Sequence, residues 1–302
     1  MKEIVFDIQR RVVAHKTVES WQTIPHAGLV IDLDVTEVLS FVDALRQKEE
    51  YRDIRITMNS VILKIIAESI KESPEINSSI SYSNKNGSGK VLYRDSIDIA
   101  VPMVTKEKRM ITPIVRNLDR LSLPDVCRAM DELKRRANNT PIDLLLVEVS
   151  LLDTKERFFK GQFLSILRRI WANFFSAQRI SMPPLKERRR FARVPLTERL
   201  GPADLLDATT LVSNGGTLVP GLPCHCVLLE IIPPQITAMG LTGIQRKPMV
   251  MKNEAGEESV AIRSIMPMTF YIDHRALDFE HVVGFLHRLH GLCAEPEELI
   301  TL

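Results

Sequence analysis

The sequence has few cysteines, no excess of charge of either sign and no apolar leader at its N-terminus. Its cysteines, Cys127, Cys224, Cys226 and Cys293, are scattered along 302 residues without the spacing of a disulfide framework. The formal net charge of +2 gives no reason to expect nucleic acid as the main partner. Because the first residues lack the apolar core of a secretory signal, we expect a protein of the reducing cytoplasm.

Two of these cysteines flank a histidine in Cys224-His225-Cys226, which suggests a metal or redox site. The run continues into apolar residues and predicts a strand over 224–229, in which alternation places both sulfurs on the same face. Two ligands do not close a zinc site. We therefore expect buried or surface thiols here, and no metal in the chain.

An alternating apolar pattern followed by a helical one is the most informative feature of the sequence. Apolar residues in 266–272 share one face at period two, and those in 279–289 follow the 3.6-residue period of an amphipathic helix. His274 and Asp278 lie four residues apart at the bend between the two patterns. At such a bend a side chain can leave the core and face a ligand.

An imidazole in this position has an obvious chemical use. Free histidine titrates near about 6.5 and can take a proton from a group that must become a nucleophile at neutral pH. A thiol, whose pKa is about 8.5, is mostly protonated at neutral pH and is a suitable group for such a base to deprotonate. Asp278 would fix the tautomer of the His274 ring or the local backbone. The alternative is that His274 merely caps the strand through a satisfied hydrogen bond.

The segment Asp273-His-Arg-Ala-Leu-Asp-Phe279 resembles the His-x-x-x-Asp-Gly signature of the dihydrolipoamide acyltransferases. These are the core subunits of 2-oxo acid dehydrogenase complexes and are related to the chloramphenicol acetyltransferases. Further segments resemble the family in the same order: Arg10–Val35, Asn59–Asn77, Ile97–Asn117 and Ile232–Gly240. Together they cover most of residues 4–150 and 205–302.

The resemblance implies an α/β fold, the chloramphenicol acetyltransferase-like two-layer sandwich of a mixed β-sheet covered by helices. It also implies a single catalytic domain over residues 1–302. The sequence pattern agrees with strands over 97–104 and 110–115 and a helix over 59–73 with one apolar stripe. The polar run 78–90, which holds Asn86-Gly87, predicts a hairpin tip.

Residue roles follow from the resemblance. His274 is similar to the family's catalytic base, and Asp278 to its orienting or structural carboxylate. Ser213, in Thr210-Leu-Val-Ser-Asn214, resembles the serine that donates a hydrogen bond to the tetrahedral oxyanion. The implied reaction moves an acyl group between coenzyme A and a thiol such as dihydrolipoamide, with acyl-CoA as substrate and without an acyl-enzyme. The implied assembly is a homotrimer with each site between His274 of one chain and Ser213 of the next. Residues 295–302 resemble the tail that joins trimers into larger cages.

The sequence departs from the family pattern at three places. Phe279 stands where the family has glycine, and the glycine-rich stretch 215–221 is not a close match. Arg10 and Arg11 are the candidates for an arginine that pairs with the aspartate. Two alternative functions stay open: acyl transfer to a hydroxyl or amine of a small molecule, and a structural core subunit without activity.

A helical and basic insertion over about 155–205 is the clearest addition to the family pattern. An apolar face over 163–175 is followed by basic residues from 186 to 199. Three interpretations compete: a helix packed on its own subunit or a neighbour, a lid or docking surface for the acyl donor or a carrier protein, and membrane-surface contact through 163–199. The apolar helix is too short to span a bilayer.

The catalytic pattern begins within the first ten residues, so we expect no lipoyl lysine in this chain. Family core subunits carry lipoyl domains ahead of the catalytic domain. Either a separate lipoylated or acyl carrier protein brings the acyl thioester, or the acceptor is not lipoyl.

Overall fold

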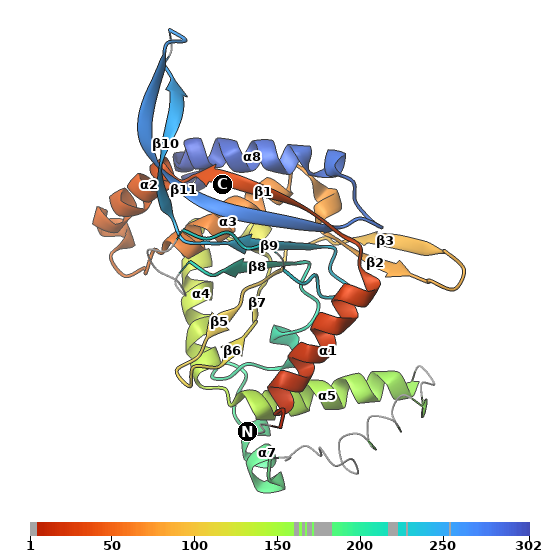
Figure 1. Cartoon of the computed structure of the whole chain (residues 1–302). Coiled ribbons are helices and arrows are strands. Elements are labelled where there is room, and N and C mark those ends of the chain that lie inside the picture. The colour runs from red at the N-terminus through yellow and green to blue at the C-terminus, as the bar shows by residue number, and fades with distance from the viewer. Residues whose placement is uncertain are drawn as a thin grey trace, which may run out of the picture. The chain divides into compact units, whose positions relative to one another are not determined.

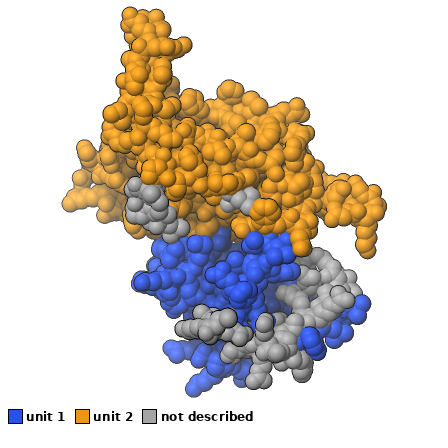
Figure 2. Space-filling model, viewed as in Figure 1, with its two compact units in different colours: residues 1–19, 103–113, 133–206 blue, residues 20–102, 114–132, 207–302 orange. Residues whose placement is uncertain are grey.

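The computed structural model describes residues 5–159, 163–164, 167, 171, 183–216, 223–227, 229–253 and 255–302. The chain divides into two compact units, which Figure 2 shows in different colours. Unit 1 comprises Met1–Glu19, Met103–Pro113 and Leu133–Leu206, and unit 2 comprises Ser20–Pro102, Ile114–Glu132 and Asp207–Leu302. The single domain expected over residues 1–302 stays a prediction.

Unit 2 is built on a mixed β-sheet with the strand order β1-β11-β9-β8-β4-β7, in which β10 also pairs with β11 (Figure 1). The strands are β1 (His26–Asp34), β4 (Ile99–Ala100), β7 (Ile114–Val115), β8 (Thr210–Asn214), β9 (Thr237–Leu241), β10 (Gln245–Lys252) and β11 (Glu258–Asp273). β8 is parallel to both β9 and β4, and the other pairs are antiparallel. The predicted α/β fold with a mixed sheet is therefore confirmed.

β11 is the longest strand of this sheet and ends at Asp273, the residue before His274. Its first half pairs with β10 in a hairpin that extends away from the sheet (Figure 1). Its second half lies between β1 and β9. All residues from Ile265 to Asp273 are buried, so both faces of this half are covered. The strand predicted over 266–272 is confirmed within β11.

Three helices of unit 2 pack on one another: α2 (Thr36–Gln47), α3 (Met58–Ile70) and α8 (Val283–Ala294). α8 contacts β1, α2 contacts β11, and α3 contacts both of these helices (Figure 1). The Thr57 side chain caps α3 by accepting a 3.1 Å hydrogen bond from the Ser60 backbone N–H. The helix predicted over 59–73 is confirmed as α3. Its burial is wider than the single apolar stripe that the sequence predicted, because all residues from Ser60 to Ile70 are buried.

Two predicted strands are interrupted by prolines. Instead of continuous strands over 97–104 and 110–115, the chain forms β4 and β7 in unit 2, and β5 (Met103–Val104) paired with β6 (Met110–Ile111) in unit 1. Pro102 and Pro113 separate the pieces. Because proline has no N–H to donate to a ladder, each strand breaks at that residue.

A separate hairpin of unit 2 consists of β2 (Ser78–Tyr82) and β3 (Gly89–Tyr93). Its tip holds Asn86-Gly87, and Gly87 has φ of 69°, a conformation that residues with a Cβ rarely adopt. The predicted hairpin tip is confirmed. Short 3₁₀ helices complete the described secondary structure: Glu49–Tyr51, Pro74–Ile76, Leu118–Arg120, Pro202–Asp204, η6 (Phe279–Val282) and Pro296–Ile300.

Unit 1 contains α5 (Ile142–Phe159) and α7 (Leu185–Ala192), while α1 (Ile8–Thr23) and α4 (Leu123–Asn138) each contribute residues to both units. Arg109 of unit 1 donates two hydrogen bonds to Asp143 at the start of α5, at 2.8 and 3.0 Å. The helix predicted over 163–175 falls mostly outside the described residues. Its described members are Phe163, Leu164, Leu167 and Trp171, all exposed. Within the described part of the chain, no helix is both long and apolar enough to cross a membrane.

Asp34, at the junction between β1 and α2, is expected to make the stability of the fold depend on pH. Burial alone raises the pKa of Asp34, but hydrogen bonds from Thr36 and Arg263 outweigh it and hold that pKa below its usual value of 3.8. A carboxyl whose pKa is lower in the folded state stabilises the fold above its unfolded pKa, and this contribution is lost as the pH falls through the folded pKa. We expect Asp34→Asn to lower the free energy of unfolding by about 1–2 kcal/mol at pH 7. In urea unfolding, the difference from wild type should shrink as the pH falls from about 5 to about 2, and a constant difference would contradict this assignment.

Candidate functional site

The turn that follows β11 presents His274 at the surface of unit 2. The backbone N–H of His274 donates a 3.0 Å hydrogen bond to the Pro25 carbonyl, just before β1. The N–H groups of Ala276 and Leu277 both donate to the Asp273 carbonyl, at 2.9 and 3.1 Å. These bonds end the strand and fix where the imidazole leaves the sheet.

A buried ion pair holds the same turn. Asp273 is fully buried, and the Arg275 guanidinium grips it with Nε 2.9 Å from Oδ1 and Nη2 2.6 Å from Oδ2. The hydrogen bond to Asp273 raises the pKa of Arg275. The Arg275 guanidinium also lies 5.4 Å from the ring centroid of Tyr82 in β2. The two partners of this ion pair are the residues immediately before and after His274. The pair was not predicted from the sequence.

His274 and Asp278 are brought together as expected. Nδ1 of His274 lies 3.2 Å from Oδ1 of Asp278, and the two side chains are 46% and 64% exposed. A proton on Nδ1 faces the carboxylate at this distance, which leaves Nε2 as the proton acceptor. Asp278 is also the residue before η6, where its backbone N–H donates to Nδ1 of His281 at 3.0 Å. Asp278 can therefore serve both roles expected of it, ring orientation and local backbone. Its pairing with Arg10 or Arg11 stays a prediction.

Phe279 replaces the expected glycine without backbone strain. It opens η6, and it is absent from the residues with positive φ in the described chain. Its ring centroid lies 6.1 Å from that of His274, and 39% of its surface is exposed. The aromatic ring therefore borders the imidazole on one side, and the bend itself does not require glycine.

Ser213 lies in β8, well away from His274 of the same chain. Ser213 pairs with Gly240 of β9, and Gly240 pairs with Thr269 of β11. His274 comes five residues after Thr269. At about 3.3 Å per residue along the strand and about 4.8 Å for each of two strand spacings, the two residues are roughly 15–20 Å apart. One chain therefore does not bring Ser213 to its own His274.

The loop after Ser213 is described only in part. Asn214 accepts a 2.9 Å hydrogen bond from the Gly216 N–H, and the Gly215 N–H donates to the Leu241 carbonyl at 2.9 Å. The rest of the glycine-rich stretch, residues 217–221, lies outside the described residues. The expected mismatch with the family therefore stays a prediction.

The strand predicted over 224–229 is wrong for the residues described there. Residues 223–227 have no strand pairing, and their carbonyls are held by side chains instead. The Thr242 hydroxyl donates to the Cys224 carbonyl at 2.7 Å, and the hydroxyls of Thr269 and Tyr271 donate to those of Cys226 and Val227. An apolar run therefore lies along the sheet without joining a ladder.

The thiols show no metal-ligand arrangement among the described residues. Three side chains there, Asp278, Glu280 and His281, lie close enough together to hold a metal ion, and Asp278 and Glu280 are exposed. Burial raises the pKa of the Cys293 thiol to about 12 and also raises that of Cys127, so both are neutral near pH 7. The expectation of no metal stays a prediction.

Comparison with known proteins identifies relatives across most of the chain. The family model described as 2-oxoacid dehydrogenases acyltransferase (catalytic domain) matches residues 2–144 and 176–301. The dihydrolipoyllysine-residue acetyltransferase component of the pyruvate dehydrogenase complex of Rickettsia felis is 24% identical over 270 residues, which is 89% of this chain and 48% of that protein. The dihydrolipoyllysine-residue succinyltransferase component of the 2-oxoglutarate dehydrogenase complex of Bacillus subtilis is 20% identical over 97% of this chain and 53% of that protein. The chain spans about half the length of these curated relatives.

Solved structures show the same fold. A crystallographic and enzymatic study of the Azotobacter vinelandii dihydrolipoamide acetyltransferase concerns a serine, a histidine and an asparagine in its catalytic mechanism. That structure has a TM-score of 0.66 at 17% identity and covers 99% of this chain and 94% of its own. The cubic core of a pyruvate dehydrogenase multienzyme complex has the same TM-score, identity and coverage.

Proposed function

Because the chain belongs to the 2-oxoacid dehydrogenases acyltransferase (catalytic domain) family, we propose that it transfers an acyl group between coenzyme A and a dihydrolipoyl thiol. The main support for this proposal is the pair of side chains after β11. Nδ1 of His274 lies 3.2 Å from Oδ1 of Asp278, and the His274 side chain is 46% exposed. A histidine held in this way presents Nε2 to an incoming thiol. The relatives support the acceptor, because their names specify a dihydrolipoyllysine residue.

The proposed reaction needs no covalent enzyme intermediate. Nε2 of His274 takes the proton from the attacking thiol, and the sulfur forms a bond to the thioester carbonyl carbon. The carbonyl oxygen becomes an oxyanion, which one preorganised hydroxyl donor can stabilise by about 2.7–4 kcal/mol. When the intermediate collapses, the carbon–sulfur bond to the departing thiol breaks, and the imidazolium returns the proton to that sulfur.

We assign the oxyanion donor to Ser213 of a neighbouring subunit. Within one chain, Ser213 lies roughly 15–20 Å from His274 by strand register, far beyond hydrogen-bond reach. The β10–β11 hairpin offers a surface for a second copy, because Val250, Val260 and Ile262 are 63–73% exposed on it. The similarity to a cubic core supports an assembly of several copies, for which we propose the homotrimer as the repeating unit.

The Azotobacter vinelandii study supports the choice of residues, because it concerns a serine, a histidine and an asparagine in the catalytic mechanism of that protein. The asparagine of that protein follows its histidine by four positions, as Asp278 follows His274. An amide oxygen and a carboxylate oxygen can both accept the proton on Nδ1. The serine precedes the histidine in both chains. On this basis Ser213, His274 and Asp278 are proposed as the site residues.

Mixed oligomers test the shared site. We expect His274→Ala and Ser213→Ala chains to be nearly inactive alone, whereas co-expressed mixtures should recover about a quarter of wild-type activity, because random assembly joins an intact serine to an intact histidine at that fraction of interfaces. Different affinity tags on the two chains isolate the mixed species. Absence of recovery in mixed oligomers would place both residues in one subunit, and a Ser213→Ala chain that is active alone would remove Ser213 from the reaction.

The identity of the acyl group and of the physiological acceptor can be determined by measuring activity with a panel of substrates. Relatives named for acetyl and succinyl transfer are both similar to this chain, so both thioesters belong in the panel. Thiol, alcohol and amine acceptors should be compared with each donor. Preference for dihydrolipoamide supports the proposal, and preference for an alcohol or amine would assign a small-molecule acyltransferase instead. A separate lipoylated carrier protein and a cytoplasmic location remain part of the proposal.

A further inference from the structure

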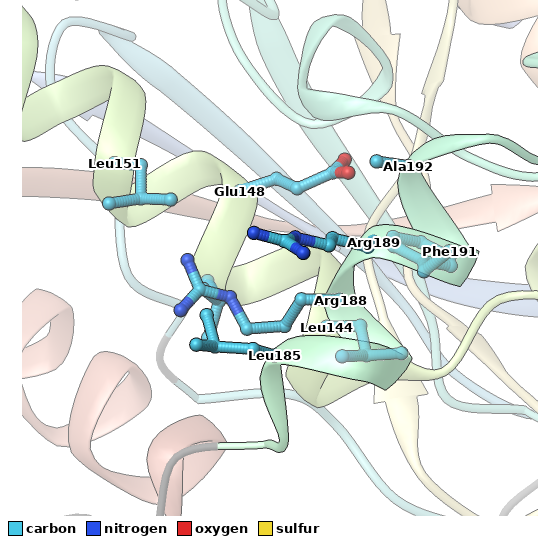
Figure 3. Close-up of a pocket in the computed structure, with 9 residues that line it drawn as sticks. Leu144, Glu148, Leu151, Leu185, Arg188, Arg189, Phe191 and Ala192 are labelled. Carbon is cyan, nitrogen blue, oxygen red and sulfur yellow. The ribbon is translucent and has the colours of Figure 1, made fainter.

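A pocket of about 330 Å³ lies between α5 and α7 in unit 1 (Figure 3). Its volume falls at the lower end of the range for small-molecule sites. The apolar part of its lining consists of Leu144, Val147, Leu151, Leu185, Phe191 and Ala192, and the charged part of Glu148, Arg188 and Arg189. The pocket therefore combines an aliphatic and aromatic wall with a few charged groups.

The negative charge of Glu148 is already balanced. Arg199 donates to both of its carboxylate oxygens, at 2.9 and 3.2 Å. The Arg199 side chain is 6% exposed, and its guanidinium carbon lies 4.0 Å from the ring centroid of Phe191. A buried, stacked and bidentate arginine holds Glu148 in place. The Glu148 carboxylate is therefore already paired with Arg199 and forms part of the pocket wall.

Arg188 and Arg189 supply a positive charge that nothing balances within the described part of the chain. No carboxylate there lies within ion-pair distance of either guanidinium, although many other arginines of the protein have such partners. Figure 3 shows both side chains extending from α7 across the pocket toward α5. Guanidinium groups favour carboxylates and phosphates, which they bind through paired hydrogen bonds.

We propose that this pocket binds an amphiphilic anion, an aliphatic chain that ends in a carboxylate or a phosphate group. The aliphatic chain lies against the α5 wall, formed by Leu144, Val147 and Leu151, and against the apolar residues of α7. The anionic end meets Arg188 and Arg189. The proposal is independent of the acyl transfer at His274.

Most of the α5 side of the pocket lies outside the part of the chain that the family model matches. The family match stops at residue 144 and resumes at 176, so Val147 and Leu151 lie in a stretch that the family model does not match. Val147 is 4% exposed, whereas Leu151 is 52% exposed. A substitution at Leu151 therefore changes the lining of the pocket without opening the core.

Binding of decanoate by the whole chain, measured by isothermal titration calorimetry below its micellar concentration, tests the proposal. We expect one decanoate or decyl phosphate per chain, and binding at least about tenfold weaker for decanol and for decyltrimethylammonium, because only an anion pairs with the guanidinium groups. Arg188→Gln and Arg189→Gln should each weaken decanoate binding by about tenfold. Leu151→Glu should do the same, because it places a negative charge beside the anion.

Matched controls lie next to the test positions. Arg190→Gln and Leu152→Glu change the same residue types on the same helices, outside the pocket lining, and should leave binding unchanged. Thermal unfolding of each variant shows that it is folded. Equal binding of all head groups, or binding unaffected by the Arg188 and Arg189 variants, would overturn the proposal. Binding to phosphatidylglycerol vesicles without binding of monomeric decanoate would also overturn it and assign α7 to a membrane surface instead.

Discussion

His274→Ala is expected to lower the rate of acyl transfer from a coenzyme A thioester to dihydrolipoamide by about 10²- to 10⁴-fold, the usual contribution of a positioned general base. The reason is that only a few per cent of a thiol with a pKa of about 8.5 is thiolate at pH 7. Nε2 of His274 removes the proton during attack, and Asp278 at 3.2 Å keeps the ring in the tautomer that allows it. Without the imidazole, only thiolate already present in solution reacts.

The pH dependence separates loss of the base from damage to the fold. Because the residual reaction of the variant uses free thiolate, its rate should rise about tenfold per pH unit up to the thiol pKa of about 8.5, and the gap from wild type should narrow. His287→Ala, which removes an exposed imidazole on α8, is the matched control and should keep full activity. A His274→Ala enzyme with unchanged turnover would refute the mechanism. A gap that stays constant with pH would show that His274 acts in some way other than as a base.

The sequence predicted the part of the site that depends on local pattern. Apolar alternation in 266–272 and the helical period after Phe279 locate a strand, a turn and a helix, and the structure has β11, the His274 turn, η6 and α8 in those places. The contact of His274 with Asp278 also follows from short-range geometry. The helix period selects one buried face, whereas the strand at 266–272 is buried on both faces and was located by its apolar composition and length.

Features that depend on pairing between distant segments were not predictable. The separation of Ser213 from His274 follows from the register of β8, β9 and β11, which no local pattern specifies. The run at 224–229 has the composition of a strand, yet Thr242, Thr269 and Tyr271 supply donors from outside the run and satisfy carbonyls of its described residues without a ladder. Local propensity was overridden there by tertiary hydrogen bonding.

The burial of α3 is the other departure from the sequence pattern, because the helix is enclosed on its polar side as well as its apolar side. Lys64 and Glu68 are 0% and 3% exposed, and Nζ of Lys64 lies 2.5 Å from Oε1 of Glu68. Lys71, whose side chain is 40% exposed, reaches the other carboxylate oxygen at 2.7 Å. A one-turn spacing that usually forms an exposed pair here forms a buried one.

Glu68→Gln should therefore lower the free energy of unfolding by about 3–5 kcal/mol, because it leaves the Lys64 ammonium buried without a counter-charge. Lys71→Met, which removes the exposed partner of the same carboxylate, should cost at most about 1 kcal/mol. Replacing both buried partners, Lys64→Met with Glu68→Leu, removes the uncompensated charge and should restore most of the lost stability. Urea unfolding of the three variants at one protein concentration measures these differences. If Glu68→Gln cost no more than Lys71→Met, the Lys64–Glu68 pair would not be the buried interaction that the structure shows.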